Sequence, residues 1–179
     1  MASVLWLLLG LSPNLQADLS DAPLYRAHFI WSNARFLAWH TGSDWHYLEA
    51  QCYQESLFEP AAVSAAGAIG LCQFLPSTFQ EVMSRMGWDH VSPYSPKASI
   101  IAAGAYMEWL LRKWTAERSQ LERLRFGWAS YNCGFGCVLK AQSKANGSIF
   151  SALVWPHLPQ ETQTYTRKIE YYHREFSEE

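Results

Sequence analysis

The carboxyl of Glu55 is the side chain in this sequence with the clearest potential for chemistry. Apolar residues at Trp45, Leu48 and Cys52 are spaced by three and four, which predicts a helix with one buried stripe. Glu55 follows three positions later, at the margin of that stripe, and Pro60 prevents the helix from continuing. A carboxyl at an apolar margin loses hydration of its charged form, so its pKa rises and it can act as an acid near neutral pH.

A longer motif begins at the same residue. The sequence from Glu55 to Gln73 reads ESLFEPAAVSAAGAIGLCQ, and an aromatic residue, Leu and Pro follow it directly. This pattern resembles the core signature of the soluble lytic transglycosylases, a branch of the goose-type lysozyme-like glycosidases. Cys72 stands where the family usually has Met. The positions in register are Glu55, Ser56, Ser64, Gly67, Ala68, Gly70, Leu71, Gln73 and Pro76.

Two shorter motifs follow in the order that the family has. ASYNCG at residues 129–134 resembles its Ala-Tyr-Asn-Ala-Gly motif, with Tyr131 and Asn132 in the matching positions. The stretch ETQTY, with Glu161 first and Tyr165 last, resembles the Glu-Thr-x-x-Tyr motif that opens the family's final helix.

The resemblance implies a mainly α, lysozyme-like helical domain with a substrate cleft. It makes Glu55 the catalytic residue and assigns substrate binding to Ser64, Gln73, Tyr131, Asn132, Glu161 and Tyr165. Structural roles remain open for several of these residues. A serine of this kind often closes a turn, a glutamine often bonds the backbone, and both tyrosines fall at core spacing. Glu161 could also stabilise the start of its helix electrostatically.

The resemblance also implies a reaction on bacterial peptidoglycan. Glu55 would protonate the oxygen that links N-acetylmuramic acid to N-acetylglucosamine, then act as the base that activates the sugar's own 6-hydroxyl. The product is a 1,6-anhydromuramoyl end, and neither metal nor cofactor takes part. Two alternatives stay open: a hydrolytic muramidase (an endolysin or lysozyme) on the same fold, and a non-catalytic peptidoglycan-binding module. A binding module has little use for an acid at Glu55. A hydrolase would be expected to need a second carboxylate, since most glycosidases use two.

Apolar periodicity predicts the helices that position these residues, and it predicts no strands. We expect helices at 78–86, 100–114, 120–131 and 162–176, and a long loop at 140–159 that borders the cleft. Capping residues are expected at Asp44, in the pair Ser77 and Gln80, and in the pair Ser119 and Glu122. Gly104, in the middle of an apolar face, would allow a neighbouring element to approach closely.

The N-terminus predicts export. Residues 1–17 are expected to be a signal peptide, because the apolar run at 4–11 is too short to span a bilayer and Ala17 could precede a cleavage site. An apolar first helix and a membrane-tethered form are the alternatives. Residues 18–42 would form an aromatic-rich helical extension, and residues 43–179 the catalytic domain. We expect the protein in the periplasm or cell envelope, and either a bacterial or a phage origin fits.

Composition excludes one class of partner. The chain of 179 residues is 49% apolar and 17% charged, as a globular domain is, and its net charge of −2 comes without a basic cluster. Nucleic-acid binding is therefore not expected. We expect a monomer without a stable membrane span.

The four cysteines, Cys52, Cys72, Cys133 and Cys137, fit an oxidising compartment. They could form disulfides, with three possible pairings, or pack as small buried hydrophobes. Cys133 and Cys137 flank Gly-Phe-Gly, so a small local ring between them is possible. A zinc site is not expected, since no second pair of ligands accompanies them.

Overall fold

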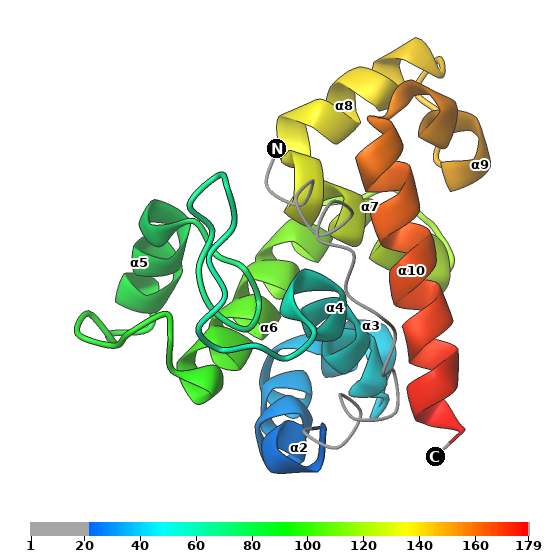
Figure 1. The fold of residues 1–179 in the computed structure, drawn as a ribbon. Helices are drawn as coiled ribbons and strands as arrows, with labels where there is room; N and C mark the ends of the chain where they lie inside the picture. The colour runs from blue at the N-terminus through cyan, green and yellow to red at the C-terminus, as the bar shows by residue number, and fades with distance from the viewer. Residues whose placement is uncertain (1–21, 179) are drawn as a thin grey trace, which may run out of the picture.

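The computed structural model describes residues 22–178, with side chains from residue 24 on. The predicted signal peptide and the first residues of the predicted extension lie outside this range. The described residues form helices and no β-strand, which confirms the mainly α prediction. The elements, drawn in Figure 1, are α2 (Ala22–Ser32), the π-helix η3 (Asn33–Leu37), α3 (Ala38–Thr41), α4 (His46–Ser56), α5 (Pro76–Arg85), α6 (Pro96–Lys113), α7 (Gln120–Cys133), α8 (Phe135–Lys144), α9 (Ser151–Val154), the 3₁₀ helix η4 (Trp155–His157) and α10 (Gln160–Ser177).

Helix α6 is the centre of the main core. It packs against α2, η3, α4, α5 and α7, and its buried face includes Ile100, Met107 and Leu111. A Cβ atom added at Gly104 would collide with the Ser32 side chain at the end of α2. The close approach expected at Gly104 is therefore confirmed, and it brings the segment from α2 to α3 into the same core as the rest of the chain.

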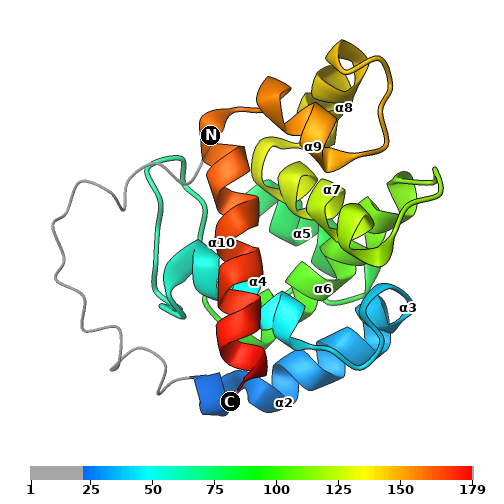
Figure 2. The same cartoon turned by 90° about the vertical axis from the view of Figure 1, so that its right-hand side faces the viewer.

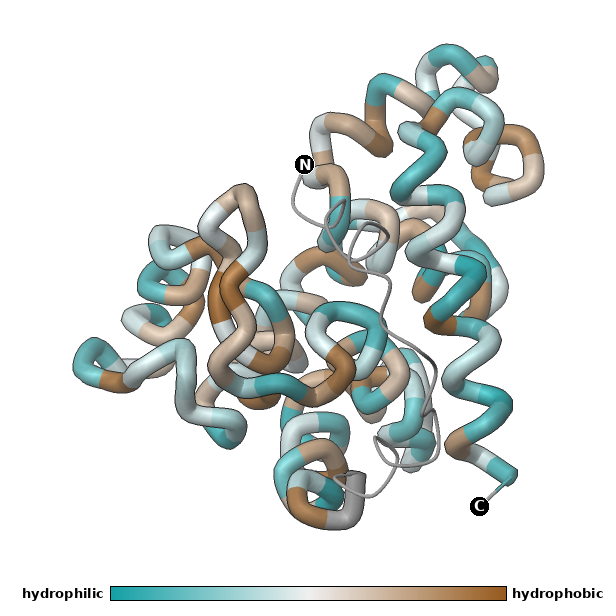
Figure 3. The backbone as a smooth tube through the Cα atoms, in the orientation of Figure 1, coloured by the Kyte–Doolittle hydropathy of each residue, from teal (hydrophilic) through white to brown (hydrophobic). Residues whose placement is uncertain are grey.

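Helix α10 lies along α4 and α7, as both views of the ribbon show (Figures 1 and 2). Its buried residues include Tyr165, Ile169 and Phe176, spaced by four and seven, which confirms the predicted final helix. The rest of the helix is mainly hydrophilic (Figure 3). Arg125 of α7 also donates to the carboxylate of Glu170, at 2.8 Å from Nε to Oε1. His173 Nε2 also lies 2.8 Å from Asp44 Oδ2, just before α4. A narrow apolar stripe and these two polar contacts thus fix α10 across the helix that carries Glu55.

The prediction of a long loop at 140–159 is wrong. Helix α8 continues to Lys144, and α9 and η4 fill residues 151–157. These short helices form because Val154 and Leu158 are buried in a second cluster with Trp114 and Phe126. Of the polar residues that suggested a loop, Asn146, Gly147 and Ser148 lie in the turn between α8 and α9, whereas Ser151 is buried at the start of α9.

The capping predictions succeed in part. Asp44 accepts a hydrogen bond from the backbone N–H of His46 at 3.2 Å, as expected for the start of α4. The predicted box of Ser77 and Gln80 is wrong, because α5 begins at Pro76, whose fixed φ suits the first helical position.

At the start of α7, Ser119 Oγ accepts from the N–H of Glu122 at 3.3 Å, but the reciprocal bond of the predicted box is absent. The Glu122 carboxylate instead binds the N–H and hydroxyl of Ser151 and the guanidinium of Arg125. Glu122, on α7, therefore caps the start of α9, which lies 29 residues later in the sequence.

Candidate active site

Glu55 lies in the last turn of α4 and is 9% exposed. Its Oε1 accepts a hydrogen bond from the Tyr165 hydroxyl at 2.6 Å. Burial raises the pKa of Glu55 to about 8, the Tyr165 hydrogen bond opposes that rise, and the charge of Glu161 adds to it. The carboxyl is therefore protonated at neutral pH, as the sequence predicts for a carboxyl at an apolar margin.

The end of α4 fixes where this carboxyl lies. The helix stops because Leu57 and Phe58 both adopt positive φ, at 56° and 62°. Phe58 is buried against Tyr53 and Phe29, so the reversal is held by packing. Ser56 Oγ then donates to the carbonyl of Leu71 at 2.8 Å, which ties the helix end to the loop that follows.

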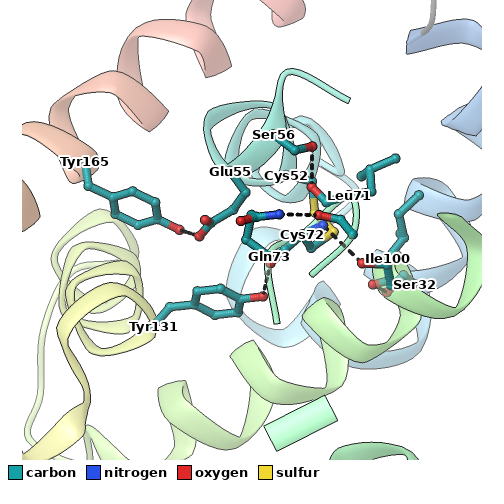
Figure 4. The surroundings of a disulfide bond; sticks show 12 residues. Ser32, Cys52, Glu55, Ser56, Leu71, Cys72, Gln73, Ile100, Tyr131 and Tyr165 are labelled. Carbon is teal, nitrogen blue, oxygen red and sulfur yellow. Dashed lines mark hydrogen bonds between the residues drawn. A yellow bond between two sulfur atoms is a disulfide. The ribbon is translucent and has the colours of Figure 1, made fainter. Parts of the chain in front are cut away.

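That loop, residues 57–75, carries Ser64 and Gln73. Ser64 Oγ accepts from the N–H of Ala68 at 3.0 Å and closes a turn. Gln73, at a φ of 49°, donates through Nε2 to the carbonyls of Ala62 and Gly70, at 3.2 and 2.9 Å. Both residues therefore make the local structural contacts that their types suggested. Gln73 also lies next to Glu55 (Figure 4), while Ser64 precedes Gln73 by nine residues in the same loop.

Helix α7 contributes Tyr131 and Asn132. The Tyr131 hydroxyl donates to the carbonyl of Cys72 at 2.8 Å. Burial, and after it the charge of Glu55, raises the pKa of Tyr131 well above its ordinary value, so the phenol stays neutral. Asn132 Oδ1 accepts from the Thr162 hydroxyl at 2.7 Å and so joins α7 to α10.

Helix α10 contributes Tyr165 and Glu161. Tyr165 is 2% exposed, and burial together with the Glu55 charge raises its pKa well above the ordinary value. It is thus a fixed hydrogen-bond donor to Glu55. Glu161 lies in the first turn of α10, where its charge reaches Glu55. The location of Glu161 is therefore compatible with both suggested roles, stabilising the start of the helix and acting near the acid.

Gln51 belongs to the same group of side chains and was missed in the sequence. It lies one turn before Glu55 on α4, is 1% exposed and lies beside the Tyr165 hydroxyl. Its Nε2 has no hydrogen-bond partner among the described residues. The spacing of four from Glu55 was the available signal, because it puts both side chains on one face of the helix.

The structure thus brings Glu55, Gln73, Tyr131 and Tyr165 together from α4, the following loop, α7 and α10 (Figure 4). Asn132 supports this group through α10. Within residues 24–178, a separate cavity of about 360 Å³ contains none of the predicted site residues. It is lined by Ala27, His28, Trp31, Trp88, Lys97 and Ile101.

The cysteines form two disulfides, Cys52–Cys72 and Cys133–Cys137. The local ring that the Gly-Phe-Gly spacing allowed is therefore present. On the same helix as Cys52, His46 Nδ1 lies 2.9 Å from Glu49 Oε2, and both Glu49 and Cys52 are buried. In the described part of the chain no three His, Cys, Asp or Glu side chains gather as a metal site needs, and no helix there is long and apolar enough to cross a bilayer.

Comparison with known proteins points to one family. Residues 32–154 match the family model of the transglycosylase SLT domain. The membrane-bound lytic murein transglycosylase F of Maricaulis maris is 36% identical over 102 residues, or 57% of this chain and 21% of that protein. The enzyme of the same name from Desulfosudis oleivorans is 34% identical over 131 residues, or 73% of this chain and 27% of that protein. The chain thus spans about a quarter of these relatives' length or less.

A solved structure shows the same fold. The lytic transglycosylase Slt of Pseudomonas aeruginosa, studied as an inactive mutant, superposes with a TM-score of 0.69 and 22% identity. The match covers 87% of this chain and 24% of that one. The predicted lysozyme-like helical fold is thereby confirmed.

Proposed function

The chain belongs to the transglycosylase SLT domain family, and on this premise we propose that it is a peptidoglycan lytic transglycosylase. It would cleave the β-1,4 bond between N-acetylmuramic acid and N-acetylglucosamine and leave 1,6-anhydromuramoyl ends. The observation that carries this proposal is the buried, protonated carboxyl of Glu55 with its hydrogen bond from Tyr165.

The reaction needs one group that first gives and then takes a proton. Glu55 donates its proton to the glycosidic oxygen as the bond from that oxygen to C1 of the muramic acid breaks. The carboxylate then removes the proton of the 6-hydroxyl of the same sugar, whose oxygen bonds to C1. The proton thus returns to Glu55 and no water is consumed. A pKa of about 8 suits both steps, because it lies close to the pH at which the acid works.

The surrounding side chains have roles that follow from their contacts. Tyr165 holds the Glu55 carboxyl in one orientation through a bond of 2.6 Å. Tyr131 and Gln73 lie beside Glu55, and Asn132 joins α7 to α10 (Figure 4). These three residues would bind the N-acetyl group and the sugar hydroxyls. Ser64 would contact the glycan from the exposed part of its loop.

A hydrolytic muramidase is the second candidate, and the position of Glu161 is the observation that favours it. A hydrolase needs a second carboxylate to act on water or on the sugar. Glu161 is close enough to Glu55 for its charge to raise the pKa of that carboxyl. In the transglycosylase mechanism, Glu161→Gln leaves an anhydro-forming enzyme, whereas in the hydrolase it removes the base and stops the release of products.

The test is mass spectrometry of the muropeptides that the purified protein releases from peptidoglycan. Anhydro ends, lighter than free reducing ends by one water, support the transglycosylase. Free reducing ends identify a hydrolase. Binding without release, by a protein whose Glu55→Gln variant behaves identically, would make the domain a binding module and refute both enzymatic candidates.

We further propose that the protein acts in the cell envelope after export. Two disulfides in the fold support this location, because such bonds persist in oxidising compartments. Fractionation of producing cells, with sequencing of the mature N-terminus, tests both the location and the removal of residues 1–17. We expect a monomer, and light scattering of the purified protein would contradict this by giving twice the mass of the chain.

A further inference from the structure

The disulfide between Cys52 and Cys72 lies beside the candidate active site. Cys52 lies on α4, one turn before Glu55, and Cys72 directly precedes Gln73 in the loop (Figure 4). Both cysteines are 0% exposed. One covalent bond therefore joins α4 to the loop that follows it. The bonded cysteines are three residues from Glu55 and one residue from Gln73.

The backbone of Cys72 makes further contacts with two other helices. Its N–H donates to Ser99 Oγ of α6 at 3.0 Å, and its carbonyl accepts from the Tyr131 hydroxyl of α7 at 2.8 Å. Through these bonds and the disulfide, α4, α6 and α7 all meet at residue 72. A change in the position of Cys72 therefore moves Tyr131, Gln73 and the Glu55 helix together.

We propose that Cys52 and Cys72 are positioning residues whose disulfide sets the active geometry of Glu55, so that the domain is active when this bond is formed and loses activity when it is reduced. The inference rests on the proposed function, since it concerns the same site. At the position of Cys72 the motif of the family usually has Met, which cannot form such a bond, so the device would belong to this chain rather than to the motif.

The size of the effect follows from the packing. Bonded sulfurs are about 2.05 Å apart, whereas two thiols that only touch need about 3.5 Å or more. Because both cysteines are fully buried in a close-packed core, this extra length must be taken up by moving the loop or α4. A displacement of about 1 Å at a catalytic group can lower the rate roughly 100-fold.

The chemical step is an ordinary exchange with a dithiol such as dithiothreitol. The sulfur–sulfur bond breaks, each cysteine gains one electron and one proton, and the reductant becomes a cyclic disulfide. Cys133–Cys137 offers an internal control. Its cysteines are half-buried and close a local ring at the junction of α7 and α8. Cys133→Ala also restores the residue that the family motif has there.

The first experiment uses the variant C133A/C137A, in which Cys52–Cys72 is the sole remaining disulfide of a chain with four cysteines. Its release of muropeptides is measured during reduction by dithiothreitol, with the fraction of free thiols determined by alkylation and mass spectrometry. We expect activity to fall roughly 10- to 100-fold in step with reduction, and to return on reoxidation, while the helical circular dichroism is retained. Fully reduced protein that keeps its activity overturns the inference.

The second experiment compares C52A/C72A with C133A/C137A well below the melting temperature of either. A purely structural disulfide would lower stability but leave the pH profile unchanged. For C52A/C72A we expect a lower kcat and a smaller change in KM. We also expect activity to decline with rising pH from a lower pH than in the unaltered protein, because water entering around Glu55 lowers its pKa. The profile of C133A/C137A should match that of the unaltered protein.

An unchanged kcat and pH profile in C52A/C72A refutes the positioning role. If the oxidised, unaltered protein releases no muropeptides, the proposed function fails instead, so the two failures are distinguishable.

Discussion

Replacing Glu55 by Gln should make the protein more stable while removing its activity. Gln has the shape of a protonated Glu, and its carbonyl can still accept the Tyr165 hydrogen bond seen at 2.6 Å. In the folded chain the pKa of Glu55 is raised from 4.5 to about 8. Between these values the unfolded chain releases the proton and the folded chain keeps it, so the stability of the unaltered protein falls as pH rises. Below pH 4.5 both states are protonated and the difference disappears.

The magnitude follows from the width of this window. One pKa unit corresponds to about 1.4 kcal/mol, so ionisation of Glu55 in the unfolded chain lowers stability by about 3 kcal/mol at pH 7. The penalty levels off at about 5 kcal/mol once the pH exceeds the folded pKa of about 8. Gln carries no such penalty. For a domain of this size, about 3 kcal/mol corresponds to a rise in Tm of roughly 6–12 °C.

Thermal and urea unfolding, followed by circular dichroism from pH 4 to pH 8, measure this difference. Glu117→Gln makes the same chemical change at an exposed position and should alter stability by less than about 0.5 kcal/mol at any pH. A gain for Glu55→Gln that is the same at pH 4 and pH 7, or a loss at pH 7, would refute the account of a buried protonated acid.

Three further variants test the surrounding structure. Tyr165→Phe removes a hydrogen bond that lowers the pKa of Glu55, so the descent of the pH–activity profile should move to higher pH, and kcat should fall; an unmoved profile contradicts the contact. Gly104→Ala places a methyl group against Ser32 and should destabilise the fold by about 1–3 kcal/mol in urea unfolding, where a neutral result would exclude the close approach. Glu122→Gln weakens the cap of α9. Since the pKa of Glu122 is lowered from its ordinary value of 4.5, the loss of stability should be full at neutral pH and shrink as the pH falls below 4.5.

Local pattern was sufficient for the parts of the site that lie on single helices. On α4, Leu48 and Cys52 are buried as predicted, and Glu55 shares their burial. The prediction of a single stripe was too narrow, because residues 48–53 are all buried and Trp45 precedes the helix and is half-buried. The spacing of the final helix placed Tyr165 on its buried face, because burial on a helix with one packed side repeats with the helical period.

Contacts between distant segments could not be predicted in the same way. The hydrogen bond from Tyr165 to Glu55 joins residues 110 positions apart, and the pairing of Cys52 with Cys72 depends on how the loop returns to α4. The helices at 151–157 were missed because they depend on burial against Trp114 and Phe126 and, for α9, on a cap by Glu122 of α7. In each case the partner is set by tertiary packing, for which residue type and spacing carry no local signal.

Digestion of peptidoglycan in water enriched with oxygen-18 tests the central claim most directly. The account predicts that the sugar's own 6-hydroxyl bonds to C1, with Glu55 as acid and base, and that water does not take part. The released muropeptides should therefore carry anhydro ends without label. Glu55→Gln should release no muropeptides. One oxygen-18 at the reducing end for each cut would show that water is the acceptor, and would contradict the single-carboxyl mechanism.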